Sequence, residues 1–159
     1  MKHQYIVCDP DKCSGCNQCE LICSVTKAGV FDPARSRIRT VRIEPVVMMS
    51  ITCRLCEDAP CVVACPRKAL SQDAKTGVIH IDNDLCDGCA WCIEACDFGA
   101  ISLNPQSKKV EICDLCADKD QPQCVLICQK ESLSFSTPEQ VARQARKEVV
   151  SQLLKELIE

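Results

Sequence analysis

Four cysteines stand at short, regular intervals in the stretch CSGCNQCELIC, residues 13–23, where two gaps of two residues precede one gap of three. The stretch CDGCAWCIEAC, residues 86–96, repeats the same intervals. Two further groups, residues 53–65 and 113–128, keep the first and last gaps and lengthen the middle one. These groups hold all the cysteines except Cys8. Because one pattern recurs four times, we expect four related structural units.

Short β-branched runs flank the cysteine groups. They precede the groups at residues 5–7, 46–51, 78–81 and 109–112, and they follow them at residues 69–70, 100–103 and 132–135. Such runs are typical of strands. Each unit is therefore predicted to run from a strand through a cysteine loop and one short helix to a second strand.

The spacing of the thiols indicates iron–sulfur chemistry. Three cysteines at gaps of two lie on a loop that curls around one cubane, while the fourth, on the short helix, points away from it. In the bacterial ferredoxin run this fourth thiolate ligates the other cluster of a pair. Structural zinc is the alternative, since C-x2-C pairs also suit tetrahedral sulfur sites. The repeated run favours iron–sulfur clusters over zinc.

Composition narrows the class of protein. Aromatic residues make up only 3% of the chain, whereas 17 of its 159 residues are cysteines, so we expect cysteine to fill much of the interior. The tight cysteine groups and the absence of a visible secretory signal argue against a disulfide scaffold and favour a reducing, cytoplasmic setting. The net charge of −3 gives no sign of nucleic-acid binding. No apolar run is long enough to span a membrane.

With these motifs, residues 4–135 resemble the four-cluster ferredoxin subunits of the dimethyl-sulfoxide-reductase type. The resemblance implies an α+β fold of two bacterial-ferredoxin-like lobes, one split in sequence and enclosing the other. The split lobe would comprise residues 1–45 and 105–136, and the contiguous lobe residues 46–104. An amphipathic C-terminal helix, residues 137–159, would follow.

The resemblance also implies four [4Fe–4S] clusters, because no ligand position is replaced. Motifs one and four would exchange their fourth ligands, as would motifs two and three. The implied sets are Cys13, Cys16, Cys19 and Cys128; Cys113, Cys116, Cys124 and Cys23; Cys53, Cys56, Cys61 and Cys96; and Cys86, Cys89, Cys92 and Cys65.

The family relays single electrons for catalytic oxidoreductases. The sequence shows no catalytic triad, phosphate loop or dinucleotide fingerprint, so the chain is expected to lack substrate chemistry of its own. Residues 28–39 resemble small subunits found beside tungsten aldehyde oxidoreductases and carbon monoxide dehydrogenases. A tungsten or molybdenum enzyme is therefore the expected partner, with a flavin subunit or a ferredoxin as the other. The alternatives are a subunit of a carbon monoxide dehydrogenase or hydrogenase, a free polyferredoxin shuttle and a zinc-bound interaction module.

Several residues outside the motifs carry expectations of their own. Cys8 is expected to be a buried thiol rather than a ligand, and His3 and His80 ordinary surface residues. Trp91 is expected to serve packing. Alternating arginines at 35, 37, 39 and 42 would share one face of a strand. The C-terminal helix is favoured to pack on its own lobe, with self-association or partner binding as alternatives.

Overall fold

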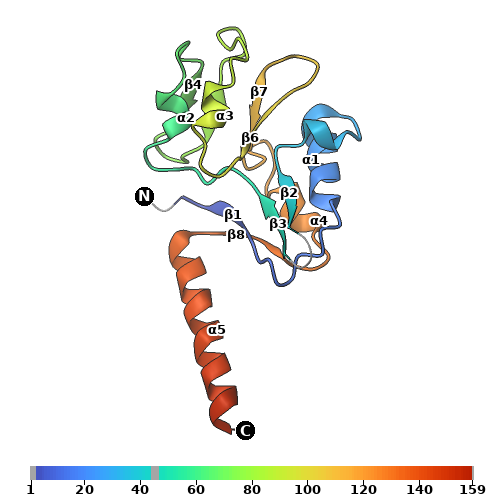
Figure 1. The fold of residues 1–159 in the computed structure, drawn as a ribbon, viewed down its shortest axis with the longest axis vertical. Coiled ribbons are helices and arrows are strands. Elements are labelled where there is room, and N and C mark those ends of the chain that lie inside the picture. The colour runs from blue at the N-terminus through green and yellow to red at the C-terminus, as the bar shows by residue number, and fades with distance from the viewer. Residues whose placement is uncertain (1–2, 44–46, 159) are drawn as a thin grey trace.

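The computed structural model describes residues 3–43 and 47–158. Figure 1 shows a body of short elements from which one long helix extends. The elements are, in chain order, β1 (Tyr5–Cys8), α1 (Gln18–Ala28), the 3-10 turn η1 (Pro33–Arg35), β2 (Arg39–Ile43), β3 (Val47–Ile51), α2 (Pro60–Val63), β4 (Leu70–Gln72), β5 (Ile79–Ile81), α3 (Trp91–Glu94), β6 (Ile101–Leu103), β7 (Val110–Ile112), α4 (Gln123–Ile127), β8 (Leu133–Ser136) and α5 (Pro138–Ile158).

The strands form four antiparallel pairs. Three are formed by strands consecutive in the chain, β2 with β3, β4 with β5 and β6 with β7. The fourth joins the first strand to the last, with Tyr5 opposite Ser136 and Cys8 opposite Leu133. Because β1 leads into the first motif and β8 follows the fourth, this pair brings together cysteines more than a hundred residues apart. The predicted strands are confirmed, except that residue 46 lies outside the described residues.

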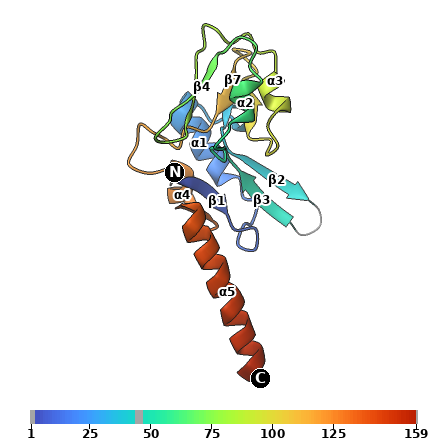
Figure 2. The same ribbon diagram turned by 90° about the vertical axis from the view of Figure 1, so that its left-hand side faces the viewer.

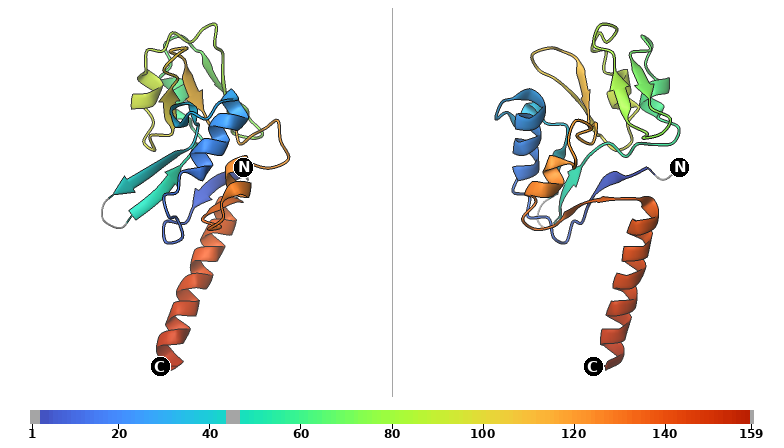
Figure 3. Two further views of the ribbon diagram at one scale, coloured as in Figure 1. Left: turned by 90° about the vertical axis from the view of Figure 1, so that its right-hand side faces the viewer. Right: turned by 180° about the vertical axis from the view of Figure 1, so that it is seen from behind.

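The helices after the cysteine loops differ in length. α2, α3 and α4 have four or five residues, and the fourth cysteine of each motif follows just beyond the helix end. α1 has 11 residues and contains Cys23. The prediction that every fourth cysteine lies on a short helix is therefore wrong. α1 packs against α4 at one side of the body and α2 against α3 at the other, with β6 and β7 between them (Figures 1 and 3).

Cysteine fills the interior, as composition predicted. Ten thiols are buried, together with small aliphatic groups centred on Ile38 and Ile112. Two of the large rings lie outside this core, since Phe31 is 81% exposed and Trp91 60% exposed, whereas Tyr5 and Phe135 are partly buried against it. The expectation that Trp91 serves packing is therefore wrong.

The four arginines do not share a strand face. Asp32 caps the 3-10 turn that contains Arg35, so the extended strand begins only at Arg39. Arg37 pairs with Asp114, while the Arg39 guanidinium donates to the carbonyl oxygens of Pro33 and Ala34. Proline and the Asx turn at Asp32 interrupt the alternation that the sequence suggested.

The C-terminal helix is confirmed, but its favoured packing is not. A capping box begins α5: the Thr137 N–H donates to Gln140 Oε1, and the Gln140 N–H donates to Thr137 Oγ1. From there α5 points away from the body in every view (Figures 1–3), and residues 142–157 are all exposed. No helix in the described ranges is both long and apolar enough to cross a bilayer.

Candidate iron–sulfur sites

The four cysteine loops share one backbone feature. The residue just before the second cysteine has a positive φ in every motif, at Gly15, Leu55, Gly88 and Leu115. This left-handed conformation turns the chain sharply between the first two cysteines. Four loops of similar spacing thus adopt a similar curl, as expected if each wraps around a similar group.

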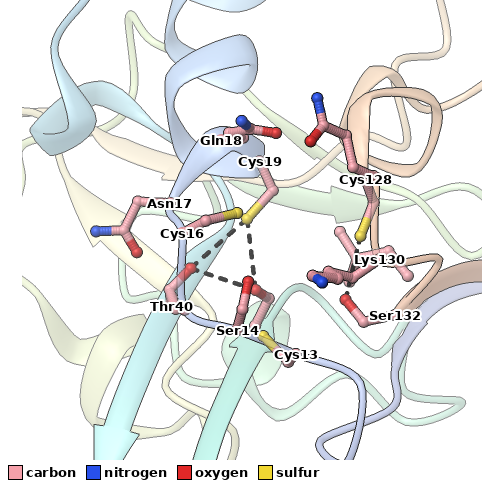
Figure 4. A pocket seen from close by; sticks show the side chains of 14 residues that line it. Cys13, Ser14, Cys16, Asn17, Gln18, Cys19, Thr40, Cys128, Lys130 and Ser132 are labelled. Atoms are coloured by element: carbon pink, nitrogen blue, oxygen red, sulfur yellow. Dashed lines mark hydrogen bonds between the residues drawn. The ribbon is translucent and has the colours of Figure 1, made fainter.

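The first cavity joins motifs one and four. It measures about 240 Å³ and is lined by Cys13, Cys16 and Cys19 from one loop and by Cys128 from the other (Figure 4). Thr40 and Ser50, from the hairpin of β2 and β3, also line this cavity. All four members of the first predicted set therefore face one space.

Two further cavities join motifs two and three. One is lined by Cys53, Cys56 and Cys61 together with Cys96 from the third motif. The other is lined by Cys86, Cys89 and Cys92 together with Cys65 from the second motif. In each case three thiols come from one loop and the fourth from the other motif.

The remaining four thiols are gathered in the buried interior. Burial raises the pKa of Cys113 to about 12, and repulsion from Cys23 contributes to the rise. Burial also raises the pKa of Cys124, with repulsion from Cys113, Cys23 and Cys116 next in size. Cys23, a residue of α1, thus lies within electrostatic reach of the fourth loop.

The sulfur of the fourth cysteine in each motif takes part in a hydrogen bond. The backbone N–H groups of Arg37, Ala69 and Ala100 donate to Cys23, Cys65 and Cys96, at N···Sγ distances of 3.3, 3.3 and 3.4 Å. The Cys128 Sγ lies 3.1 Å from Ser132 Oγ. Burial alone would raise the pKa of Cys128, but hydrogen bonds led by Ser132 outweigh it and lower that pKa. Such donors stabilise negative charge on sulfur.

Most of the other buried thiols disfavour ionisation. Burial raises the pKa of Cys53 and Cys92 to about 11, ahead of repulsion from neighbouring cysteines. These groups therefore keep their protons at neutral pH unless a cation binds. Iron would have to displace those protons, so loading of the sites is expected to release protons.

The donor set fits a multi-iron group. Within residues 3–43 and 47–158, no three Cys, His, Asp or Glu side chains lie close enough together to hold one metal ion. In a [4Fe–4S] cube each thiolate binds a different iron, so the thiols stand farther apart than ligands of a single ion. Four thiols around a shared cavity, with N–H donors behind them, are an arrangement suited to such a cube.

Cys8, His3 and His80 lie outside the motifs and do not line the three cavities, although the Cys8 thiol is within side-chain hydrogen-bond reach of Cys13. Cys8 is buried, and its Sγ accepts a hydrogen bond from the Ser50 N–H at 3.3 Å rather than facing one of the three cavities. His80 is exposed on β5 and His3 is half-buried against Gly77. This agrees with the expectation of a buried thiol and with that of a surface histidine at position 80.

Sequence reasoning missed two groups that touch the sites. Thr40 and Ser50 lie 3.6 and 3.4 Å from Cys19 Sγ through their hydroxyl oxygens. Lys27 binds Asp114, which stands between the first two cysteines of motif four. Neither contact has a local sequence signal, because the partners are 21 to 87 residues apart and only the tertiary fold joins them.

Comparison with known proteins agrees with this geometry. Residues 45–137 match the family described as 4Fe-4S dicluster domain. The chain belongs to this family. Its cofactor is accordingly the [4Fe–4S] cluster, carried by cysteine motifs such as those assembled here.

The relatives of this dicluster-domain chain share most of its length. The polyferredoxin-like subunit of an aliphatic sulfonate oxidoreductase from Pyrococcus furiosus is 44% identical over 78% of this chain and 70% of its own. The thiosulfate reductase electron transfer subunit PhsB of Salmonella typhi is 31% identical over 85% of this chain and 77% of its own. Both are named as subunits of oxidoreductases.

A solved structure supports the fold. One chain of the active site complex BamBC of benzoyl coenzyme A reductase superposes with a TM-score of 0.53 at 26% identity. The match covers 86% of this chain and 77% of that one. Electron-transfer iron–sulfur proteins that serve oxidoreductases are therefore the group to which this chain is similar.

Proposed function

We propose that the chain holds four [4Fe–4S] clusters and relays single electrons between a catalytic oxidoreductase subunit and a second redox partner. One observation carries the proposal: three cavities are each lined by four thiols, three from one motif and the fourth from another. When bound, each cluster supplies one-electron chemistry at a potential set by hydrogen bonds, burial and nearby charge.

The proposed ligands follow from these groupings. Motifs one and four exchange their fourth cysteines, as do motifs two and three. The four sets, numbered by the motif that supplies three of their cysteines, are Cys13, Cys16, Cys19 and Cys128 (first); Cys53, Cys56, Cys61 and Cys96 (second); Cys65, Cys86, Cys89 and Cys92 (third); and Cys23, Cys113, Cys116 and Cys124 (fourth).

Two lobes are proposed on the same basis. Residues 1–45 and 105–136 form a split lobe, and residues 46–104 form a contiguous lobe inside it. Pairing of β1 with β8 and packing of α1 on α4 support the first, and packing of α2 on α3 supports the second. The hairpins β2–β3 and β6–β7 each take one strand from either lobe, so they tie the two together.

Electrostatic interactions between sets support a linear order. Burial and repulsion from the other cysteines of the fourth set are the largest causes of the raised pKa of Cys124. Repulsion from Cys19 of the first set adds to this rise. Cys53 of the second set acts similarly on Cys113 of the fourth. Burial is the largest cause of the raised pKa of Cys92 in the third set, and repulsion from Cys61 of the second set raises this pKa further. The sets therefore form a row in which the first and third lie at the ends and the fourth and second in the middle.

The ends of this row are open to solvent. Cys16 in the first set and Cys89 in the third are exposed, whereas each cysteine of the two middle sets is buried or half-buried. Trp91 is exposed close to Cys89 in the chain. A relay needs this arrangement, because electrons enter and leave where a partner can approach, and the buried middle is shielded from side reactions.

The identity of the partners is proposed from the relatives. Their names point to a catalytic oxidoreductase subunit as one partner. We propose a tungsten or molybdenum enzyme, with a flavin subunit or ferredoxin as the other partner. A cytoplasmic location is proposed from the abundance of reduced cysteines that clusters require.

Anaerobic affinity purification of the tagged chain from its source organism tests the relay. The proposal predicts that a catalytic oxidoreductase subunit co-purifies in a fixed ratio and that its substrate bleaches the visible absorbance of the clusters. A chain that elutes alone, and that several unrelated enzymes reduce equally fast, would establish the free shuttle instead.

A further inference from the structure

One arginine stands inside the cysteine loop of the second motif. The position directly after the first cysteine differs between the four motifs, and only the second motif has a cation there: Ser14, Arg54, Asp87 and Asp114. Because the four loops share a similar curl, this position brings a different charge to each of four similar sites. Arg54 lies between Cys53 and Cys56 in the chain, so its charge belongs to the second site.

Two aromatic rings hold the Arg54 guanidinium beside this site. Its carbon Cζ lies 5.4 Å from the centroid of the Tyr5 ring and 5.7 Å from that of the Phe98 ring. Phe98 lines the cavity of the second cysteine set, and so does Arg54. Cation–π attraction favours one position for a long side chain that could otherwise extend into water.

The two rings come from distant parts of the chain. Tyr5 lies on β1, at the end of the body from which α5 extends (Figure 2). Phe98 lies between α3 and β6. A further cavity of about 510 Å³ is lined by Tyr5, Arg54 and Phe98. Loss of a ring contact would therefore leave the arginine room to move away from the second cysteine set.

The charge of Arg54 is not neutralised by a neighbouring side chain. In the described part of the chain its guanidinium forms no hydrogen bond or ion pair. Two carboxylates are close: Glu57 lines the 510 Å³ cavity and Asp97 lines that of the second set. Both are exposed, so water and salt screen them, whereas Arg54 is half-buried. The net field of these groups at the second set therefore depends chiefly on Arg54.

We propose that Arg54 raises the reduction potential of the second cluster, an inference that rests on the proposed relay. Reduction adds one electron, supplied by a partner of the relay, and makes the cluster more negative. A nearby cation stabilises that state, and more strongly at a half-buried position than in water. No proton moves with the electron, because arginine stays protonated. Since the second set lies in the middle of the proposed row, Arg54 favours an electron in the interior over one at an exposed end.

An EPR-monitored redox titration of the anaerobically purified holoprotein tests this role. Arg54→Gln should move the potential of the second cluster to more negative values and leave the other three nearly unchanged. Cys96→Ser identifies the signal of that cluster, because Cys96 lines its cavity. Arg54→Lys keeps the charge and should shift the potential much less than Arg54→Gln. The control is Arg143→Gln, which removes the same charge from the exposed helix α5 and should move no potential.

Tyr5→Leu tests whether the ring positions the arginine. Tyr5 contacts Arg54 but lies outside the lining of the second cavity, so its effect on the cluster should pass through Arg54. We expect a shift in the same direction as for Arg54→Gln but smaller. In a chain that already carries Arg54→Gln, adding Tyr5→Leu should produce no further shift.

Iron and sulfide content separates failure of this inference from failure of the relay. Protein without inorganic sulfide would overturn both. With four clusters present, the role of Arg54 would be overturned by an unmoved second potential in Arg54→Gln, by equal shifts of all four potentials, or by an Arg54→Lys shift as large as that of Arg54→Gln. Additive shifts of Tyr5→Leu and Arg54→Gln would overturn the positioning role of Tyr5.

Discussion

Lys27 Nζ lies 3.0 Å from a carboxylate oxygen of Asp114, so the last turn of α1 is joined to the fourth cysteine loop. Lys27 also pairs with Asp118 at 2.5 Å, and Arg37 Nη1 pairs with Asp114 at 2.9 Å. The Lys27 side chain is only 10% exposed. This network joins the two sequence-distant halves of the proposed split lobe close to Cys23, which we propose as the fourth thiol of the fourth set.

Lys27→Met should loosen this junction. The substitution keeps the apolar stem and removes the charge, leaving Asp114 and Asp118 without their shared partner. We expect a loss of about 1 kcal/mol, between the values for exposed and buried ion pairs. That corresponds to roughly fivefold faster bleaching of the clusters in guanidinium. Lys119→Met is the control, because it removes the same charge from a looser ion pair. Lys119 Nζ lies 3.6 Å from the Asp118 carboxylate, and the Lys119 side chain is about half exposed. Equal bleaching rates for the two variants would contradict the role given to Lys27.

Gly88→Ala should disrupt the third cysteine loop. Gly88 has a φ of +73°, and an added Cβ would lie 2.0 Å from the Lys108 carbonyl oxygen, a backbone atom. Gly99→Ala is the matched control, since its φ is +59° but no atom lies within 4 Å of the new Cβ. The control should cost about 1 kcal/mol from backbone strain alone. Gly88→Ala should cost more and lower the iron content; if both variants retain full iron, the close approach to Lys108 is unimportant.

Cys65→Ser should damage a cluster other than the one held by its own loop. Because the Cys65 thiol lines a cavity with Cys86, Cys89 and Cys92, the EPR signal of that cluster should be lost or altered. The cluster of Cys53, Cys56 and Cys61 should persist. Cys8→Ser is the control and should keep all the iron. Loss of the loop's own cluster instead would refute the ligand exchange.

Ser50→Ala should lower the reduction potential of the first cluster. The Ser50 hydroxyl lies 3.4 Å from Cys19 Sγ and stabilises the more negative, reduced state. An EPR-monitored redox titration should show one potential moving to more negative values while the other three stay unchanged. A variant with four unchanged potentials would mean that this hydroxyl has no influence on the cluster.

The parts of the fold that depend on local sequence were predictable. The β-branched run ending at Ile112 gives β7, and the capping box at Thr137 starts α5. The ligand sets around Cys128, Cys96 and Cys65 were inferred from a family resemblance and stay a prediction, although the same thiols line the three cavities. Local patterns succeed here because strands and caps need only neighbouring residues.

Other features depend on contacts that no local pattern encodes. The contact of Lys27 with Asp114 joins residues 87 positions apart, and the hydroxyls of Thr40 and Ser50 reach Cys19 only after β2 and β3 form a hairpin. The alternating arginines wrongly predicted one continuous strand, because Asp32 and Pro33 start a 3-10 turn that includes Arg35. The apolar periodicity of α5 predicted an amphipathic helix, but whether this helix packs on its own body depends on tertiary contacts, which the sequence pattern does not encode.

The most direct test of the account is the ratio of iron and acid-labile sulfide to chain in protein prepared without oxygen. Sixteen cysteines in four complete sets predict about 16 iron and 16 sulfide per chain, with a broad absorbance near 400 nm that reduction bleaches. A protein that instead contains zinc or disulfides and no inorganic sulfide would contradict the account.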